Sequence, residues 1–116
     1  MDQLLIPSGF LGAGKGGEGF QPCAPVAENH AAYYEAAGVA AVAYHHVDPG
    51  AGHMDFIDSG APGLCAGGED PQATRAAGIK TLVAFMRRHL RGEEPYGSFL
   101  DGADVDPRFT WDSKGP

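Results

Sequence analysis

The sequence has little of several features that commonly reveal a function. Its two cysteines, Cys23 and Cys65, form no CxxC pair, which excludes a zinc knuckle and leaves a single disulfide between them open. It contains no run of about 18 apolar residues, so no membrane-spanning helix is expected. Eight basic residues stand against 15 acidic ones, and the net charge of −7 argues against a non-specific nucleic-acid binder. Residues 1–6 lack the charged start and long apolar run of a signal peptide.

Glycine, in contrast, is abundant, with 18 of 116 residues, and nine prolines accompany it. This glycine share is more than twice that of an average protein, so much of the chain must form turns and loops. Hydrophobic residues make up 43% of the chain, which excludes disorder on composition. The length suits one small domain with one core.

The pattern of apolar residues predicts an α/β protein with a parallel sheet. We expect a short buried strand over 3–9, a helix over 30–37 capped by Asn29, and a strand over 39–47. The apolar first half of the second strand is typical of a strand buried on both faces. Two such strands cannot form a complete sheet, so the strands need neighbours that this chain does not contain.

A long helix is predicted to begin after Asp70, with Pro71 in its first turn, and to end at Gly92. We expect its core face to be the apolar stripe of Ile79, Leu82, Val83, Met86 and Leu90. Five of the eight basic residues lie mostly off that stripe and are expected on a solvated face. Residues 93–116 carry six acids and two bases and are expected to form an acidic, loop-rich surface tail.

The glycine-rich run Gly9–Lys15 nearly fits a phosphate-binding loop. A dinucleotide-binding pattern is also satisfied, at Gly12, Gly14 and Gly17. However, Gly16 stands where a hydroxyl should hold Mg²⁺. Pro22 and Pro25 prevent the helix whose N-terminal amides would bind phosphate. These two departures weaken the match, and we keep a nucleotide-binding protein only as an alternative hypothesis.

The segment 48–58 follows the second strand and carries a histidine, His53, beside Gly52. Imidazole titrates near neutral pH, so a histidine on a loop at a strand end is well placed for proton transfer. A metal-binding module is a second alternative, because nitrogen and oxygen ligands are dense at His45, His46, Asp48, His53 and Asp55. Against it, His45 and His46 are strand neighbours whose side chains point to opposite faces.

Four short segments, in this order, resemble the C-terminal part of chlorophyllase, an ester hydrolase of the α/β-hydrolase fold. They are Ser8–Gly12, then Phe20–Pro25 with Asn29-His30 and Tyr33-Tyr34, then Gly52–Asp55 with Ile57-Asp58, and finally Leu64-Cys65 with Leu82–Phe85. The resemblance implies a fold of strand, helix, strand, histidine loop and long helix with an incomplete sheet. It covers residues 1–92, which we expect to be the domain part, and leaves 93–116 as the tail.

The resemblance implies hydrolysis of chlorophyll to chlorophyllide and phytol, a step of chlorophyll catabolism, without a cofactor or a metal. In this fold a serine attacks the ester, a histidine takes its proton, and an aspartate orients the histidine. His53 occupies the place of the histidine. Asp55 is not expected to be the triad acid, because that residue precedes the histidine in this fold. Met54, Phe56 and Ile57 either line an apolar ester pocket or serve only in packing.

The chain departs from the family in having no GxSxG motif, and its four serines are Ser8, Ser59, Ser98 and Ser113. Of these serines, Ser8 comes nearest to the position of a nucleophile, because it lies at the end of an expected strand and precedes a glycine. We therefore expect a fragment that is inactive alone, with nucleophile, acid and oxyanion hole on a missing N-terminal part. A non-catalytic remnant that binds a partner through exposed strand edges is a further alternative. The family suggests a plastid or another membrane-rich compartment of a photosynthetic organism.

Overall fold

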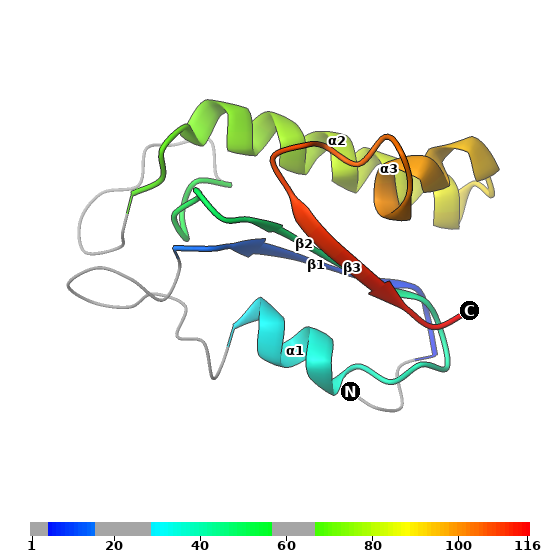
Figure 1. Ribbon diagram of the computed structural model, residues 1–116. Helices are drawn as coiled ribbons and strands as arrows, with labels where there is room; N and C mark the ends of the chain where they lie inside the picture. Colours follow the sequence, from blue (N-terminus) through cyan, green and yellow to red (C-terminus); the bar gives the residue numbers. More distant parts are fainter. Residues whose placement is uncertain (1–4, 16–28, 57–66) are drawn as a thin grey trace.

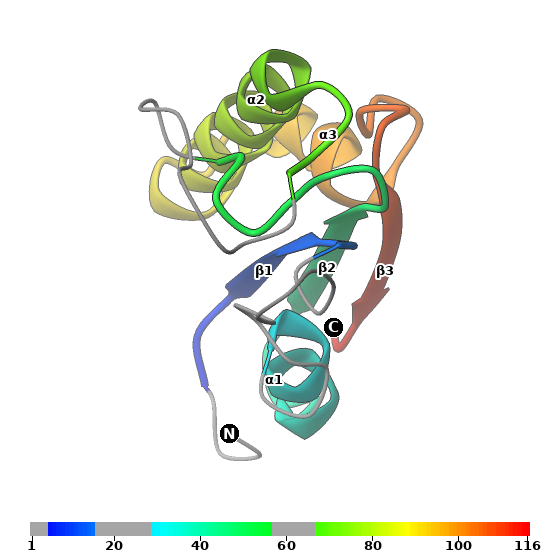
Figure 2. The same ribbon diagram turned by 90° about the vertical axis from the view of Figure 1, so that its left-hand side faces the viewer.

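The computed structural model describes residues 5–15, 29–56 and 67–116, and these residues form a small α/β unit. The three strands make one mixed sheet, in which β1 is parallel and β3 antiparallel to the central β2. Helix α1 covers one face of the sheet, and α2 with α3 covers the other (Figure 1 and Figure 2). The elements in chain order are β1 (Ser8–Ala13), α1 (His30–Ala36), β2 (Ala43–Asp48), α2 (Pro71–Leu90), η2 (Glu94–Gly97), α3 (Ser98–Asp101) and β3 (Thr110–Lys114). The α/β class expected from the sequence is therefore confirmed.

The sequence predicts a strand over 3–9, but strand β1 begins only at Ser8 and continues through Ala13. The glycines within and after it permit close contacts across the fold. A Cβ on Gly12 would overlap the ring of His30, and a Cβ on Gly14 would lie 2.5 Å from the Cα atom of Pro49. Glycine at these two positions therefore lets α1 and the end of β2 approach β1.

Strand β2 occupies only the second half of the segment expected to be a strand, from Ala43 onward. Its side chains alternate between two small apolar clusters on opposite faces of the sheet. On one face Ala43 packs with Tyr34 and Ala37 of the α1 region. On the other face Tyr44 packs with Ala84 and Leu100, from α2 and α3. Among the described residues, few large apolar side chains cover each face of the sheet, so this part of the core is thin.

Helix α2 begins and ends where the sequence predicts. The carboxylate of Asp70 accepts the N–H of Ala73 at 3.1 Å, and Pro71 occupies the first turn. After the helix, Gly92 has a φ of +70°, a left-handed conformation that favours glycine.

The prediction of which face of α2 packs against the core is wrong. Its buried side is a stripe of small residues, Thr74, Ala77, Gly78, Thr81 and Ala84. The large apolar stripe faces outward instead, and its five members Ile79, Leu82, Val83, Met86 and Leu90 are between 44% and 76% exposed. Small side chains let the helix lie close to the sheet, and the large side chains are left without a covering layer among the described residues.

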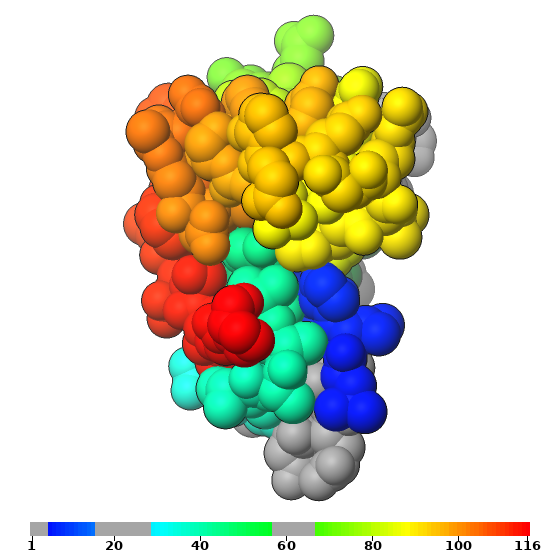
Figure 3. Space-filling model, turned by 90° about the vertical axis from the view of Figure 1, so that its right-hand side faces the viewer, coloured from blue at the N-terminus to red at the C-terminus, as the bar shows by residue number. Residues whose placement is uncertain are grey.

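Residues 93–116 are not the solvated tail expected from their charge. After α2 the chain forms η2 and α3, then returns along β2 as β3, with Val47 opposite Thr110 and Ala43 opposite Lys114. Figure 3 shows the region of α3, in orange, beside the end of α2, in yellow, and above the C-terminal residues, in red. Leu100 is 1% exposed, and Phe109 is also buried. The acidic residues lie on the outside of a segment whose apolar residues pack inward.

Leu100→Ala tests whether this segment stabilises the domain. Leu100 packs with Tyr44 and Ala84, so its truncation leaves a cavity between α3 and the sheet. We expect a loss of about 2–4 kcal/mol in the free energy of unfolding. Urea denaturation followed by circular dichroism measures this loss. The exposed Leu90, at 76%, gives a matched control whose alanine variant should unfold like the wild type. Equal stability of the two variants would contradict the packing of this segment.

Two histidine rings meet between α1 and β2. Nδ1 of His30 lies 2.7 Å from Nε2 of His45, and the ring of Tyr34 stacks on His45 with centroids 4.8 Å apart. At that separation the two nitrogens share one proton, so at least one ring must be neutral. Burial lowers the pKa of His30. It also lowers the pKa of His45, where the neighbouring His30 and His46 add to the effect and Asp112 and Glu35 oppose it.

The histidine pair predicts that the domain loses stability in mild acid. Both pKa values are lowered in the folded state, so the unfolded chain binds more protons as the pH falls below about 6.5. We expect the melting temperature to fall by several degrees between pH 7.5 and pH 5. His45→Gln, whose amide cannot take up a proton, should reduce this pH dependence. An unchanged melting temperature over the same range would contradict the prediction.

Candidate active site

The candidate site is built on the last residue of β2, Asp48, which is 2% exposed. One carboxylate oxygen accepts the hydroxyl of Thr74 at 2.7 Å and the Nε–H of Arg108 at 3.0 Å. The other accepts the N–H of Gly50 at 3.0 Å. The charge of Asp48 is thus matched by a guanidinium and by two neutral donors, as a buried carboxylate requires. These contacts join the end of β2, the first turn of α2 and the segment before β3.

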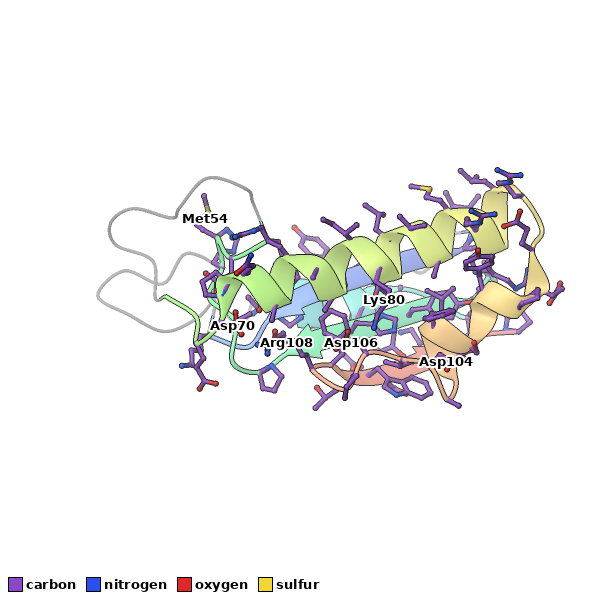
Figure 4. All side chains as sticks on the ribbon, turned by 90° about the horizontal axis from the view of Figure 1, so that it is seen from above. Met54, Asp70, Lys80, Asp104, Asp106 and Arg108 are labelled. Carbon is purple, nitrogen blue, oxygen red and sulfur yellow. The ribbon has the colours of Figure 1, made fainter. Side chains whose placement is uncertain are left out.

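Arg108 belongs to a short chain of charges that reaches α2. Its backbone N–H donates to Asp106 at 2.9 Å, and Asp106 pairs with Lys80 at 2.6 Å. Figure 4 shows Arg108 and Asp106 lying beside α2, with Lys80 directed toward Asp106. The hydrogen bond to Asp48 raises the pKa of Arg108 above its usual value, so the guanidinium stays charged. This support has no local signal in the sequence, because Arg108 lies in the expected tail, 60 positions after Asp48.

The loop after Asp48 is tied to its neighbours by backbone hydrogen bonds. The N–H of Lys15 donates to the carbonyl of Ala51 at 2.9 Å, and the N–H of Glu69 donates to the carbonyl of Gly50 at 2.9 Å. Ala51 is fully buried. These bonds connect the loop to the end of β1 and to the segment that leads into α2. The loop is therefore held in place at the carboxyl end of β2, and it positions the backbone that leads into His53.

Of the five histidines in the chain, His53 is the exposed one. It lies in the turn that follows these hydrogen-bonded residues. The other four are partly or fully buried and bonded. Besides the His30–His45 pair, His46 lies 2.7 Å from the carbonyl of Leu100, and His89 lies 2.9 Å from the hydroxyl of Tyr44. Burial lowers the pKa of both His46 and His89. Among the histidines, His53 alone has a ring that a substrate could approach freely.

The described serines lie away from His53. Ser8 begins β1 opposite Ala43, whereas the His53 loop follows Asp48, which lies opposite Ala13. Five residues of strand separate the two ends, about 16 Å, so Ser8 is not within reach of His53. Ser113 lies opposite Tyr44, and the hydroxyl of Ser98 donates to Asp104 at 2.6 Å beyond the far end of α2. Ser59 and the two cysteines, Cys23 and Cys65, lie outside the described residues.

The structure does not assemble a phosphate-binding loop from Gly9–Lys15. Residues 9–13 are extended and paired with β2, and a phosphate cradle needs a loop there. Gly12 and Gly14 serve the close contacts with His30 and Pro49 described above. The Nζ atom of Lys15 lies 3.5 Å from the carboxylate of Glu69. A nucleotide site therefore has no support within the described part of the chain.

The proposed metal ligands are also kept apart by their own contacts. His45 pairs with His30 and His46 with Leu100, while Asp48 binds Thr74 and Arg108. Across residues 5–15, 29–56 and 67–116, the structure brings no three histidine or acidic side chains together in a way that could hold a metal ion.

Two adjoining apolar hollows, which share Leu11 and Leu82, form a groove at the junction of β1 and α2. Its first hollow is lined by Leu11, Phe56, Arg75, Gly78, Ile79 and Leu82. A second hollow continues it past Leu82 to Phe85 and Met86. Phe56, a candidate pocket residue, lies against Gly78 of α2, and a Cβ at Gly78 would be 3.1 Å from its ring. Met54 lies near the start of α2 (Figure 4), and Ile57 falls outside the described residues.

Comparison with known proteins identifies the family. The family model described as chlorophyllase matches residues 1–107. Chlorophyllase-2 from Arabidopsis thaliana is 32% identical over 100 residues, which cover 78% of this chain. The same match covers 30% of the relative, so the chain corresponds to less than a third of its length. No solved structure matches the chain. Among the described residues, no helix has the length and apolar character needed to cross a membrane.

Proposed function

The chain belongs to the chlorophyllase family. We propose that it supplies the C-terminal part, with the catalytic histidine, of a carboxylic ester hydrolase of the α/β-hydrolase fold. The observation that carries the proposal is the place of His53. It is an exposed histidine on an ordered loop at the carboxyl end of a parallel strand, where this fold has its catalytic histidine.

In the proposed reaction the imidazole of His53 is the general base. It takes the proton of a serine hydroxyl as the serine oxygen attacks the ester carbonyl, and it then gives that proton to the leaving alcohol. Water, deprotonated by the same imidazole, releases the acid from the serine. The proposed substrate is chlorophyll or a related apolar ester, which would yield chlorophyllide and phytol. The serine, the orienting acid and the oxyanion hole belong to the N-terminal part of the hydrolase domain.

The site for this N-terminal part is the outer edge of β1 together with the groove along α2. Among the described strands β1 pairs with β2 alone, so its other edge is open to a further strand. The groove beside it is lined by large, partly exposed apolar side chains such as Leu11, Ile79 and Leu82. The limited share of the relative that the chain matches also supports such an occupant. Extension of the sheet at this edge would cover the part of the outward-facing stripe of α2 that lines the groove, Ile79, Leu82 and Met86.

The experiment is a complementation of two separately purified parts. The 116-residue chain is mixed with the serine-bearing N-terminal part of Arabidopsis chlorophyllase-2, and hydrolysis of p-nitrophenyl butyrate and of chlorophyll is followed. We expect turnover in the mixture and in neither part alone. Association of the two parts without hydrolysis of either ester would contradict the hydrolase assignment.

Two leucines of α2 test the docking groove. Leu82→Lys places a charge in the groove and should weaken association, because a buried, unpaired lysine is unfavourable. Leu90→Lys is the matched control, because Leu90 lies at the end of the same helix and lines neither hollow. Equal association of the two variants, measured by analytical ultracentrifugation, would show that the N-terminal part docks elsewhere.

A further inference from the structure

The turn that carries His53 is closed by two hydrogen bonds between its first and last residues. The N–H of Gly52 donates to a carboxylate oxygen of Asp55 at 2.9 Å, and the N–H of Asp55 donates to the carbonyl of Gly52 at 3.1 Å. Asp55 is 4% exposed, whereas His53, between the two ends, is exposed. The carboxylate therefore lies beneath the turn, and the imidazole lies on its outer side.

The segment before α2 is shaped to accommodate this carboxylate. A Cβ on Gly68 would overlap the Asp55 oxygen that binds the Gly52 amide, and it would also lie 2.9 Å from the nitrogen of Gly52. Only glycine at position 68 leaves room for the bond between Gly52 and Asp55. The segment that leads into α2 thus packs against the buried side of the turn. The residue that precedes the turn, Ala51, is buried and holds the start of the turn in place.

We propose that Asp55 is the positioning residue for His53: its buried carboxylate holds the Gly52 amide and so fixes where the imidazole stands. The proposal rests on the proposed function, since it gives His53 the role of general base. No hydrogen bond joins Asp55 to the His53 ring, so Asp55 acts through the backbone and is distinct from the acid that orients the imidazole. A bond to an ionised acceptor is stronger than one to a neutral acceptor, which makes a carboxylate well suited to this place.

The first test measures the turn itself. Hydrogen exchange of the Gly52 amide, followed by NMR, should become about tenfold to a hundredfold faster in Asp55→Ala, because the turn loses a charge-assisted bond. Asp55→Asn keeps an acceptor oxygen of the same shape and should restore most of the protection. Asp70→Ala removes the N-cap of α2 and serves as the control for general destabilisation. Unchanged exchange at Gly52 in Asp55→Ala would overturn the proposal.

The second test uses the complemented hydrolase with p-nitrophenyl butyrate. Asp55→Ala should lower kcat by about a hundredfold at an unchanged KM, as expected when a catalytic group is displaced by about 1 Å. Asp55→Asn should recover most of that loss, and Asp70→Ala should leave kcat near the wild-type value. Equal kcat values for Asp55→Ala and Asp70→Ala would overturn the positioning role. If turnover does not depend on His53, the proposed function fails, whereas the exchange of the Gly52 amide still decides whether Asp55 holds the turn.

Discussion

His53→Ala is expected to lower ester hydrolysis by the complemented hydrolase by about a thousandfold or more. Without the imidazole, no group in the described part of the loop takes the proton from the attacking serine, and kcat falls. Because His53 is exposed, the same change should leave the melting temperature and the association of the two parts unaltered. The rate is measured with p-nitrophenyl butyrate at saturating concentrations of both parts.

Chemical rescue distinguishes a lost base from a lost structure. Added imidazole should restore part of the activity of His53→Ala, because it can occupy the vacated space and accept the proton. His53→Gln should be as inactive as the alanine variant, since an amide is a poor base. A His53→Ala variant that retains more than about a tenth of the wild-type rate would rule out His53 as the general base.

Asp48→Ala is expected to have the largest effect on stability, a loss of about 3 kcal/mol or more in the free energy of unfolding. The change leaves the hydroxyl of Thr74 and the N–H of Gly50 without their acceptor. It also removes the partner of Arg108, which connects the segment before β3 to the strand end. Urea denaturation monitored by circular dichroism gives the size of the loss.

Asp104→Ala provides a comparison within the same acidic protein. Asp104 is exposed and binds the hydroxyl of Ser98 at the surface, so its removal should cost less than about 1 kcal/mol. Asp48→Asn should lie between the two, because the amide keeps an acceptor oxygen but loses the charge. If Asp48→Ala and Asp104→Ala unfold at the same urea concentration, the strand end is not held as described.

The ends of α2 were predictable from sequence, whereas its orientation was not. Asp70 and Gly92 carry local signals, since a capping carboxylate and a left-handed glycine need only their neighbours in the chain. The direction of the apolar stripe depends on what lies opposite it. Periodicity identified two faces, but the small residues around Ala77 face the sheet, and Leu82 faces outward. In the sequence, an apolar stripe looks the same whether it faces the sheet or lies on the outer side of the helix.

Contacts between distant parts of the chain explain the other differences. Gly12 and Gly14 indicated a loop, but they sit against His30 and Pro49 and permit an extended strand. At the site, His53 was predicted from its loop and from the family resemblance. Thr74 and Arg108 bind Asp48, from which the His53 loop begins. They have no local signal in the sequence, because they lie 26 and 60 positions after Asp48.

We propose that this chain contributes the catalytic histidine of an ester hydrolase and that the nucleophile lies on the N-terminal part. Labelling with a fluorophosphonate, which reacts covalently with an activated serine, tests both statements at once. The complemented pair is treated, digested and analysed by mass spectrometry. We predict a label on a serine of the N-terminal part, and loss of that label when the chain carries His53→Ala. A label on Ser8, Ser59, Ser98 or Ser113, or labelling that does not depend on His53, would contradict the account.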